Sequence, residues 1–228
     1  MLDATDALRL KEAGLQGGVL LDISRPGTLN ANAAAPAEDT RPIVQDLSRF
    51  RLPPNFRGRS AWFVQLWWLV QGTLFALSPQ ALYGWRNFLL RAFGARVGTN
   101  VLVRPSVRIT YPWKISIGDR SWIGDHAELY SLGEITIGAD AVVSQKAYLC
   151  TGSHDHRSPA FDIYANPIVV EDQAWVCADV FVHPGVVVGS GAVIAARSVL
   201  RSDAEPYGLY SGAPAELRGR RQPRGEAS

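Results

Sequence analysis

An aliphatic residue recurs at every sixth position between Val97 and Leu200 of this 228-residue chain, with a few breaks. A period of six fits neither an amphipathic helix nor a simple alternating strand. Short fixed repeats with few charged residues indicate a parallel β-solenoid, in which each repeat forms one side of a coil. The aliphatic positions are Val97, Val103, Ile109, Ile115, Ile117, Ile123, Leu129, Ile135, Ile137, Val143, Leu149, Val170, Val176, Val182, Val188, Ile194 and Leu200. We therefore expect a mainly β fold.

Small residues lie four positions after many of these aliphatic residues, as the filling of a narrow core requires. They are Ser121, Ala127, Gly133, Ala141, Ala147, Ala174, Ala192 and Ser198. Three repeats would form one triangular coil, and about five such coils would stack roughly 4.8 Å apart. Glycines that follow aliphatic positions are predicted to form tight corners with positive φ. These are Gly118, Gly124, Gly138 and Gly189.

The largest break in the repeat separates Leu149 from Val170. Its length of 21 residues is one full coil plus three, so we expect a loop to leave the solenoid here. The loop begins with the sequence Thr-Gly-Ser-His-Asp at 151–155, which includes His154. At the mouth of such a loop a substrate could approach an imidazole that is not buried in the coil.

The chain before the repeat has a different character. Residues 61–77 contain no charged residue, and a second apolar run extends through Phe93. Both runs are long enough to predict helices. Residues before about position 45 are rich in Ala, Gly and Pro without periodicity, which is typical of a mobile arm. The predicted regions are an arm (1–45), a helical region (46–96), a β-helix domain (97–206) and a C-terminal segment (207–228).

The uncharged run at 61–77 allows two interpretations. Seventeen residues is the lower limit for spanning a bilayer, and Gln65, Gln71 and Gly72 weaken that assignment. Three tryptophans near one end would suit either a packed surface or a membrane interface. The helices therefore either cover the main domain or a subunit interface, or make peripheral membrane contact through residues 61–93.

Composition excludes several classes of protein. A net charge of +2 gives no dense basic footprint, so nucleic acid is not expected as a partner. Cys150 and Cys177 are the only cysteines and form no CxxC pair, which argues against a disulfide scaffold and a thiolate-rich zinc site. A reducing compartment fits best, and the first residues do not have the pattern of a secretory signal. We expect a cytoplasmic protein, with membrane association left open.

Several motifs between about 130 and 200 together resemble one known family. They are Tyr148-Leu-Cys-Thr-Gly-Ser-His-Asp, Phe161, Pro167-Ile168, Ala174-Trp175 and Pro184-Gly185-Val186. With the repeats, they resemble the hexapeptide-repeat acyltransferases, specifically the branch of colanic-acid or exopolysaccharide O-acetyltransferases. The resemblance covers roughly residues 88–220. It implies a left-handed parallel β-helix and a homotrimer with active sites between subunits.

The resemblance also implies that His154 is the general base. Imidazole accepts a proton near neutral pH, as the attack of a hydroxyl on a thioester requires. His156 is the rival candidate, two residues further on. The second ring nitrogen of the base needs a carboxylate or a backbone carbonyl as partner. Asp155, Glu134 and Glu128 are available, and the sequence does not choose among them.

Acetyl-CoA is the co-substrate that the resemblance implies, with no metal. The residues it assigns to coenzyme A are Trp175, Ala178, Ala195, Ala196, Arg201, Gly212, Pro214 and Arg218. Those it assigns to the acceptor are Tyr130, Ser131, Glu134 and Asp155. Ser202 and Glu216 replace basic residues that are common in the family, which weakens the assignment of the phosphate contacts.

The expected function is acetyl transfer from acetyl-CoA to a sugar hydroxyl, in exopolysaccharide or saccharide-precursor synthesis. Two alternatives use the same fold. A γ-type carbonic anhydrase would need a histidine pair with four residues between, whereas His154 and His156 are separated by one. A non-catalytic, membrane-associated solenoid would not need the intact motif around His154.

Overall fold

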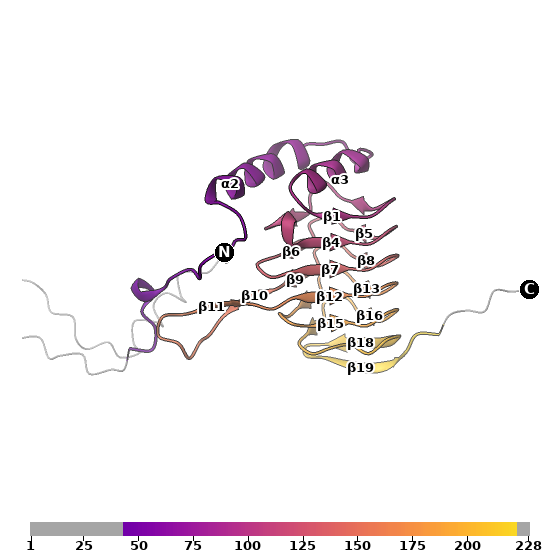
Figure 1. The fold of residues 1–228 in the computed structure, drawn as a ribbon. Coiled ribbons are helices and arrows are strands. Elements are labelled where there is room, and N and C mark those ends of the chain that lie inside the picture. The colour runs from indigo at the N-terminus through magenta and orange to yellow at the C-terminus, as the bar shows by residue number, and fades with distance from the viewer. Residues whose placement is uncertain (1–42, 223–228) are drawn as a thin grey trace, which may run out of the picture. The chain divides into compact units, whose positions relative to one another are not determined.

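Short strands follow one another from residue 96 to residue 220 and stack as successive coils (Figure 1). The computed structural model describes residues 43–222. One sheet comprises β1 (Arg96–Val97), β4 (Ile115–Ile117), β7 (Ile135–Ile137), β12 (Ile168–Val170) and β15 (Val187–Val188). The second comprises β2 (Leu102–Val103), β5 (Trp122–Ile123), β8 (Val142–Val143), β13 (Trp175–Val176), β16 (Val193–Ile194), β18 (Gly208–Gly212) and β19 (Ala215–Arg220). The third comprises β3 (Arg108–Ile109), β6 (Glu128–Tyr130), β9 (Tyr148–Cys150), β14 (Phe181–Val182) and β17 (Val199–Leu200). All pairs within these sheets are parallel except the final β18–β19 hairpin, so the predicted parallel solenoid is confirmed.

The repeated aliphatic residues form the core. Ile117 pairs in register with Ile137, and Ile137 in turn pairs with Val170. Both isoleucines and the valine are buried, and so are the small residues Ala141 and Ala174 between the larger ones. Each coil therefore places the same kind of side chain above the last, as the six-residue period predicts.

The corners differ from the prediction. Gly118, Gly124, Gly138 and Gly189 do not have positive φ, and the prediction for these four residues is wrong. Positive φ occurs instead at non-glycine residues such as Arg120 and His126, two residues after a glycine. A Cβ on Gly118 would lie 2.5 Å from the backbone nitrogen of Ala139 in the next coil. Glycine is required there because neighbouring coils approach closely, and not because of its φ.

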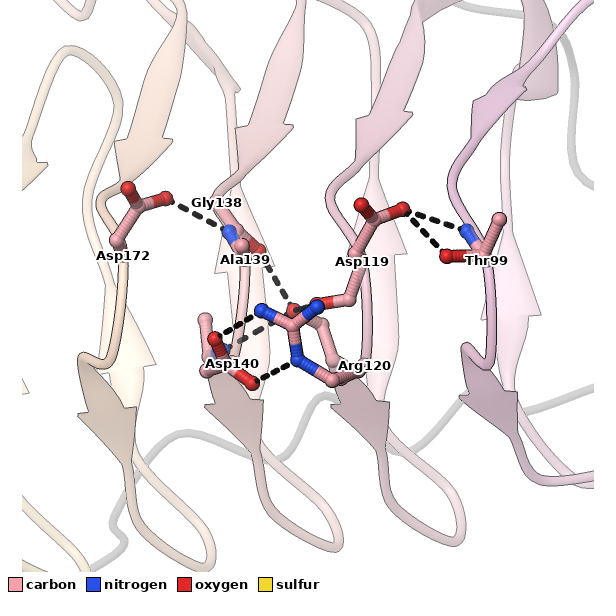
Figure 2. Close-up of polar contacts among 9 residues, drawn as sticks. Thr99, Asp119, Arg120, Gly138, Ala139, Asp140 and Asp172 are labelled. Atoms are coloured by element: carbon pink, nitrogen blue, oxygen red, sulfur yellow. Dashed lines mark hydrogen bonds and ion pairs between the residues drawn. The ribbon is translucent and has the colours of Figure 1, made fainter.

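Polar side chains link the coils at one corner (Figure 2). The carboxylate of Asp119 accepts a hydrogen bond from the backbone N–H of Thr99 at 2.6 Å, one coil earlier. Asp172 accepts the N–H of Ala139 in the same way at 2.7 Å. Arg120 makes two contacts of 2.7 and 2.6 Å with Asp140 in the next coil. The two aspartate contacts satisfy corner N–H groups that the short strands leave unpaired, and the Arg120–Asp140 pair joins side chains of neighbouring coils.

Helices cover the beginning of the solenoid (Figure 1). They are α2 (Ala61–Val70), its π-helical continuation η2 (Gln71–Phe75) and α3 (Tyr83–Ala92). The 3-10 turn η1 (Leu47–Arg49) lies away from this end of the stack (Figure 1), and a further 3-10 turn, η3 (Pro112–Lys114), forms a corner. Ser60 caps α2, accepting a hydrogen bond from the N–H of Phe63 at 3.3 Å. We call the segment 43–96 the helical cap. No helix between residues 43 and 222 has the length and apolar character needed to cross a bilayer.

The cap is bonded to the first coil through buried polar side chains. Trp67 donates its indole N–H to the carbonyl of Ile109 at 2.8 Å. Arg86 is fully buried and its Nε donates to the carbonyl of Val103 at 2.6 Å. Asn87 donates to the carbonyl of Val101 at 2.8 Å. The first coil has no preceding coil to bond its outer edge, and the cap supplies the missing donors.

The predicted domain boundaries stay predictions. Nearly all of the predicted arm, 1–45, lies outside the described residues. Within the predicted C-terminal segment, β18 pairs with β16, which extends the second sheet past residue 206.

Candidate active site

A hairpin leaves the solenoid where the repeat breaks. Strand β10 (Gly152–His154) pairs antiparallel with β11 (Ile163–Ala165), so the predicted loop is present. A Cβ at Gly152 would lie 2.6 Å from Cδ1 of Leu132, so a larger residue there would require the Leu132 side chain to move. Because His154 ends β10, the hairpin fixes the backbone of this histidine.

The ring of His154 is held on two sides. Its Nδ1 lies 2.7 Å from the backbone carbonyl oxygen of Phe161, across the hairpin. The Phe161 ring stacks on the imidazole, with ring centres 4.0 Å apart and planes 9° from parallel. Phe50 of the cap segment approaches the same imidazole, at 5.9 Å between centres. The side chain is half-buried.

The contact with Phe161 determines the tautomer of His154. A carbonyl oxygen only accepts hydrogen bonds, so Nδ1 carries the proton in the neutral ring. Nε2 then has a free lone pair and can accept a proton. Three carboxylates and a backbone carbonyl were the alternatives for this partner, and the structure has the carbonyl of Phe161 there. A backbone carbonyl leaves no signal in the sequence.

The candidate acceptor residues have different surroundings. Tyr130 is half-buried on β6 and stacks edge-on to Tyr148 at 6.0 Å. Ser131 is fully buried, and its hydroxyl bonds both the N–H and the carbonyl of Tyr111 at 2.8 and 3.0 Å. Its hydroxyl therefore joins two coils and does not face a binding surface. Glu134 is exposed, at the corner that precedes β7.

Asp155 does not contact the imidazole of its neighbour His154. Its carboxylate accepts the backbone N–H of Arg157 at 2.9 Å, which stabilises the turn of the hairpin. Its own N–H donates to the carbonyl of Asp162 at 2.8 Å. These two bonds give Asp155 a structural role at the tip of the hairpin.

Trp175 lines a groove of about 700 Å³ on the outer face of the second sheet. The indole is 44% exposed, and its N–H donates to the hydroxyl of Ser144 at 2.9 Å. The same groove is lined by Val142 and by Trp122, which is 55% exposed. Trp122, Val142 and Trp175 stand in register on adjacent strands. No sequence motif indicated Trp122, although it occupies an outward position of the repeat.

The predicted small residues gather at one corner of the solenoid, between the second and third sheets. The carbonyl of Ala178 accepts the N–H of Arg197, so the corners of Ala178 and Ala195-Ala196 are stacked. Gly212 joins this corner because its N–H donates to the hydroxyl of Ser198 at 3.1 Å. Side chains this small leave the backbone accessible along the corner.

The predicted arginines and Pro214 lie toward the last coil. Arg218 is exposed on β19 and its guanidinium is 3.1 Å from the carboxylate of Glu216. Arg201 is exposed after β17. Burial, together with the charge of Arg201, lowers the pKa of His183. Pro214 is exposed in the turn between β18 and β19.

Cys150 is the thiol closest in sequence to His154. It is buried, and its thiol donates to the carbonyl of Gly152 at 3.1 Å. Burial raises its pKa above the ordinary value. The thiol is therefore protonated at neutral pH and is a poor nucleophile. Among residues 43–222, no three His, Cys, Asp or Glu side chains come together as metal ligands would.

Solved structures that share this fold are hexapeptide-repeat acetyltransferases. The enzyme VCA0836 from Vibrio cholerae, complexed with acetyl coenzyme A, superposes with a TM-score of 0.64 at 26% identity over 72% of this chain and 91% of its own. A galactoside acetyltransferase in complex with coenzyme A gives a TM-score of 0.66 over 74% of this chain and 84% of its own, and its 22% identity shows the fold alone. No family model matches the chain.

The fold and the histidine hairpin thus define a hexapeptide-repeat acetyltransferase. A protein of Escherichia coli strain K12, "Putative colanic acid biosynthesis acetyltransferase WcaF", is 62% identical over 155 residues, which are 68% of this chain and 85% of that protein. The chain belongs to this family of acetyltransferases and is an enzyme. The galactoside O-acetyltransferase of the same strain is a more distant relative, 27% identical over 58% of this chain and 66% of its own.

Proposed function

We propose that this enzyme transfers an acetyl group from acetyl-CoA to a sugar hydroxyl in exopolysaccharide or saccharide-precursor synthesis, with His154 as general base. The observation that carries the proposal is the 2.7 Å contact between Nδ1 of His154 and the carbonyl of Phe161. In the neutral ring, this contact places the proton on Nδ1, leaves the lone pair of Nε2 free and holds the ring in one orientation. The names of the relatives, which refer to colanic acid and to a galactoside, support a saccharide acceptor.

The reaction is a direct displacement at the thioester carbonyl. The sugar hydroxyl attacks the acetyl carbon while Nε2 of His154 takes its proton, giving a tetrahedral intermediate. The carbon–sulfur bond then breaks, and the proton on the imidazolium passes to the departing thiolate or to solvent. An acyl-enzyme on Cys150 is not part of the proposal, because that thiol is buried and its pKa is raised.

We assign the donor to the groove and corner that begin at Trp175. An apolar wall with one indole suits the pantetheine arm, and the small residues Ala178, Ala195 and Ala196 allow it to approach the backbone. Arg218, on β19 of the second sheet, and Arg201, which follows β17 of the third sheet, are both exposed near the last coil and suit phosphate. Tyr130 and Glu134 are proposed to face the acceptor.

The assembly and location are part of the same proposal. We propose a homotrimer with active sites between subunits, supported by the exposed tryptophans of the second sheet. A cytoplasmic location is supported by the two free cysteines. Peripheral membrane contact through residues 61–93 would bring the enzyme to saccharides that are carried on lipid.

The test is thiol release from acetyl-CoA in the presence of a panel of sugars. His154→Ala should lower the rate by about a thousandfold, since a positioned base contributes roughly 10²–10⁴. His156→Ala is the matched control, an exposed histidine two residues away that should retain the rate. Cys150→Ala should also retain it. Full activity of His154→Ala, or acetyl-Cys150 trapped in the absence of acceptor, would contradict the proposed mechanism.

A further inference from the structure

The outward side of the helical cap is apolar. Its exposed side chains form what we call the outer cap surface: Trp62, Leu69, Leu74, Leu77, Leu82, Trp85 and Phe88. Trp62 and Leu69 are seven residues apart on α2 and share one helix face. Leu77 is 79% exposed, the largest value among these residues, and Trp62 follows at 70%.

The members of this surface on η2 and α3, and between them, lie close together. Leu74, Leu77, Leu82 and Trp85 line one shallow hollow between η2 and α3. The indole N–H of Trp85 donates to the carbonyl of Leu74 at 3.0 Å, and its ring stacks on Phe88 at 5.7 Å. A contiguous exposed apolar patch of this kind marks a site of interaction rather than an ordinary surface.

No exposed charge interrupts this surface. Arg86 is the only charged residue between 61 and 90, and it is fully buried. Its guanidinium is occupied by Val103 and by acceptors on Ser78, Pro79 and Gln80. The inner side of the cap therefore packs on the solenoid, whereas no part of residues 43–222 covers the outer side.

Positive charge flanks the outer cap surface at both ends. Residues 43–96 contain seven arginines and one acidic residue, Asp46, a net charge of +6 in a chain whose total is +2. Arg57 and Arg59 precede α2, and Arg91 and Arg96 follow at the end of α3 and in β1; all four are exposed. None of the four forms an ion pair with a carboxylate in residues 43–222.

This charge pattern distinguishes between possible partners. A second copy of the chain docked cap to cap would bring two sets of unpaired arginines together, which is unfavourable. An anionic membrane surface complements the arginines and accepts the apolar side chains. Tryptophans are also favoured at the depth of the headgroups. Since neither helix can span a bilayer, α2 and α3 would lie in the plane of the interface.

We propose that the helical cap binds the surface of membranes that contain anionic lipids, with the outer cap surface inserted among the headgroups and Arg57 and Arg59 on lipid phosphates. The peripheral membrane contact proposed above is thereby assigned to anionic lipids. It does not depend on acetyl transfer. In this orientation the solenoid points away from the membrane with its β18–β19 end outermost (Figure 1).

Co-sedimentation of the full-length protein with vesicles tests the proposal. Binding should require phosphatidylglycerol in phosphatidylcholine vesicles and should weaken strongly at about 0.5 M salt, where charges are screened. Leu77→Ser with Phe88→Ser should lower vesicle affinity by about tenfold or more, since both side chains are mainly exposed and their loss removes apolar contact with lipid. Arg57→Gln with Arg59→Gln should remove the preference for anionic vesicles.

A matched control keeps the test specific. Leu217→Ser, on β19 at the opposite end of the solenoid, replaces a 43% exposed leucine and should bind vesicles like the native chain. His154→Ala should also bind normally, so failure of the reaction and failure of docking are separate results. Equal binding to vesicles without anionic lipid would overturn the proposal.

Two other outcomes would show that something other than a membrane covers the outer cap surface. If the native chain does not bind and instead forms a larger assembly that Leu77→Ser dissociates, a second copy covers the cap and the proposal is wrong. If only a chain lacking residues 1–42 binds vesicles, that segment covers the cap in the intact protein, which also overturns the proposal.

Discussion

The helical cap and the solenoid provide hydrogen-bond partners for unpaired backbone groups in different ways. Each coil of the solenoid bonds to the coil before it, and its outer charges are mixed, with 11 basic and 13 acidic residues between 97 and 222. The first coil has no predecessor, so the cap bonds it with side chains, among them the buried Arg86. Repetition lets each coil of the solenoid bond its neighbour through the backbone, whereas the cap bonds the first coil through a few individual side chains.

The strongest test of this difference is Arg86→Ala. The change removes a fully buried side chain that donates to three backbone carbonyls and one hydroxyl, and the carbonyl of Val103 among them is buried. We expect the free energy of unfolding to fall by about 3–5 kcal/mol, measured by urea denaturation. Arg91→Ala is the control, because this exposed arginine also bonds two carbonyls of the first coil. A comparable loss in both variants would mean that burial is not the reason for the importance of Arg86.

A pair of glycine-to-alanine variants compares the packing of the solenoid with that of the helical cap. In Gly118→Ala the new Cβ would meet the backbone of the next coil, and we expect a loss of about 3 kcal/mol from overpacking. Gly84→Ala, in α3, meets nothing within 4 Å and should stabilise the helix by about 0.5–1 kcal/mol. Thermal denaturation of both variants measures the contrast. If Gly118→Ala is tolerated, the coils can separate locally and the close approach is not a constraint.

The smallest effect is a pH dependence in the solenoid. The pKa of Asp119 lies below its usual value, because the N–H of Thr99 and then its hydroxyl donate to the carboxylate. The ionised form therefore favours the folded chain above the ordinary pKa of about 4, and this contribution is lost as the pH falls below it. Asp119→Asn keeps an acceptor without the charge, so its melting temperature should fall less between pH 5 and pH 3 than that of the native chain. An identical fall in both would exclude this carboxylate as a contributor.

The sequence predicted the solenoid well because its period repeats. Ile123 and Val176, for example, are buried at the positions that the six-residue rule assigns. The pattern located the corner glycines correctly, but the positive φ expected of them was wrong. They are needed because neighbouring coils come into contact, which the sequence of one repeat does not show. A loop that carries His154 out of the solenoid was predicted from the missing period alone, but its β10–β11 pairing was not.

The surroundings of the candidate site were less predictable. Ser131 was expected to face the acceptor, but its hydroxyl joins two coils in the interior. Trp122 was not singled out, and only the register of β5 with β8 and of β8 with β13 places it in the groove of Trp175. Such residues come from different coils and lie close together because successive coils stack on one another. The pattern along the chain does not show which residues of neighbouring coils become adjacent.

The sequence by itself determined the class of fold, the buried positions of the coils and the place where the chain leaves them, because each depends on a local period or its interruption. The tertiary structure alone decided that the carbonyl of Phe161 orients His154 and that Arg86 is buried. It also decided which side of an uncharged helical run faces outward. Such facts depend on groups brought together from distant positions or on backbone atoms that every residue shares, and neither is encoded at a single site in the chain.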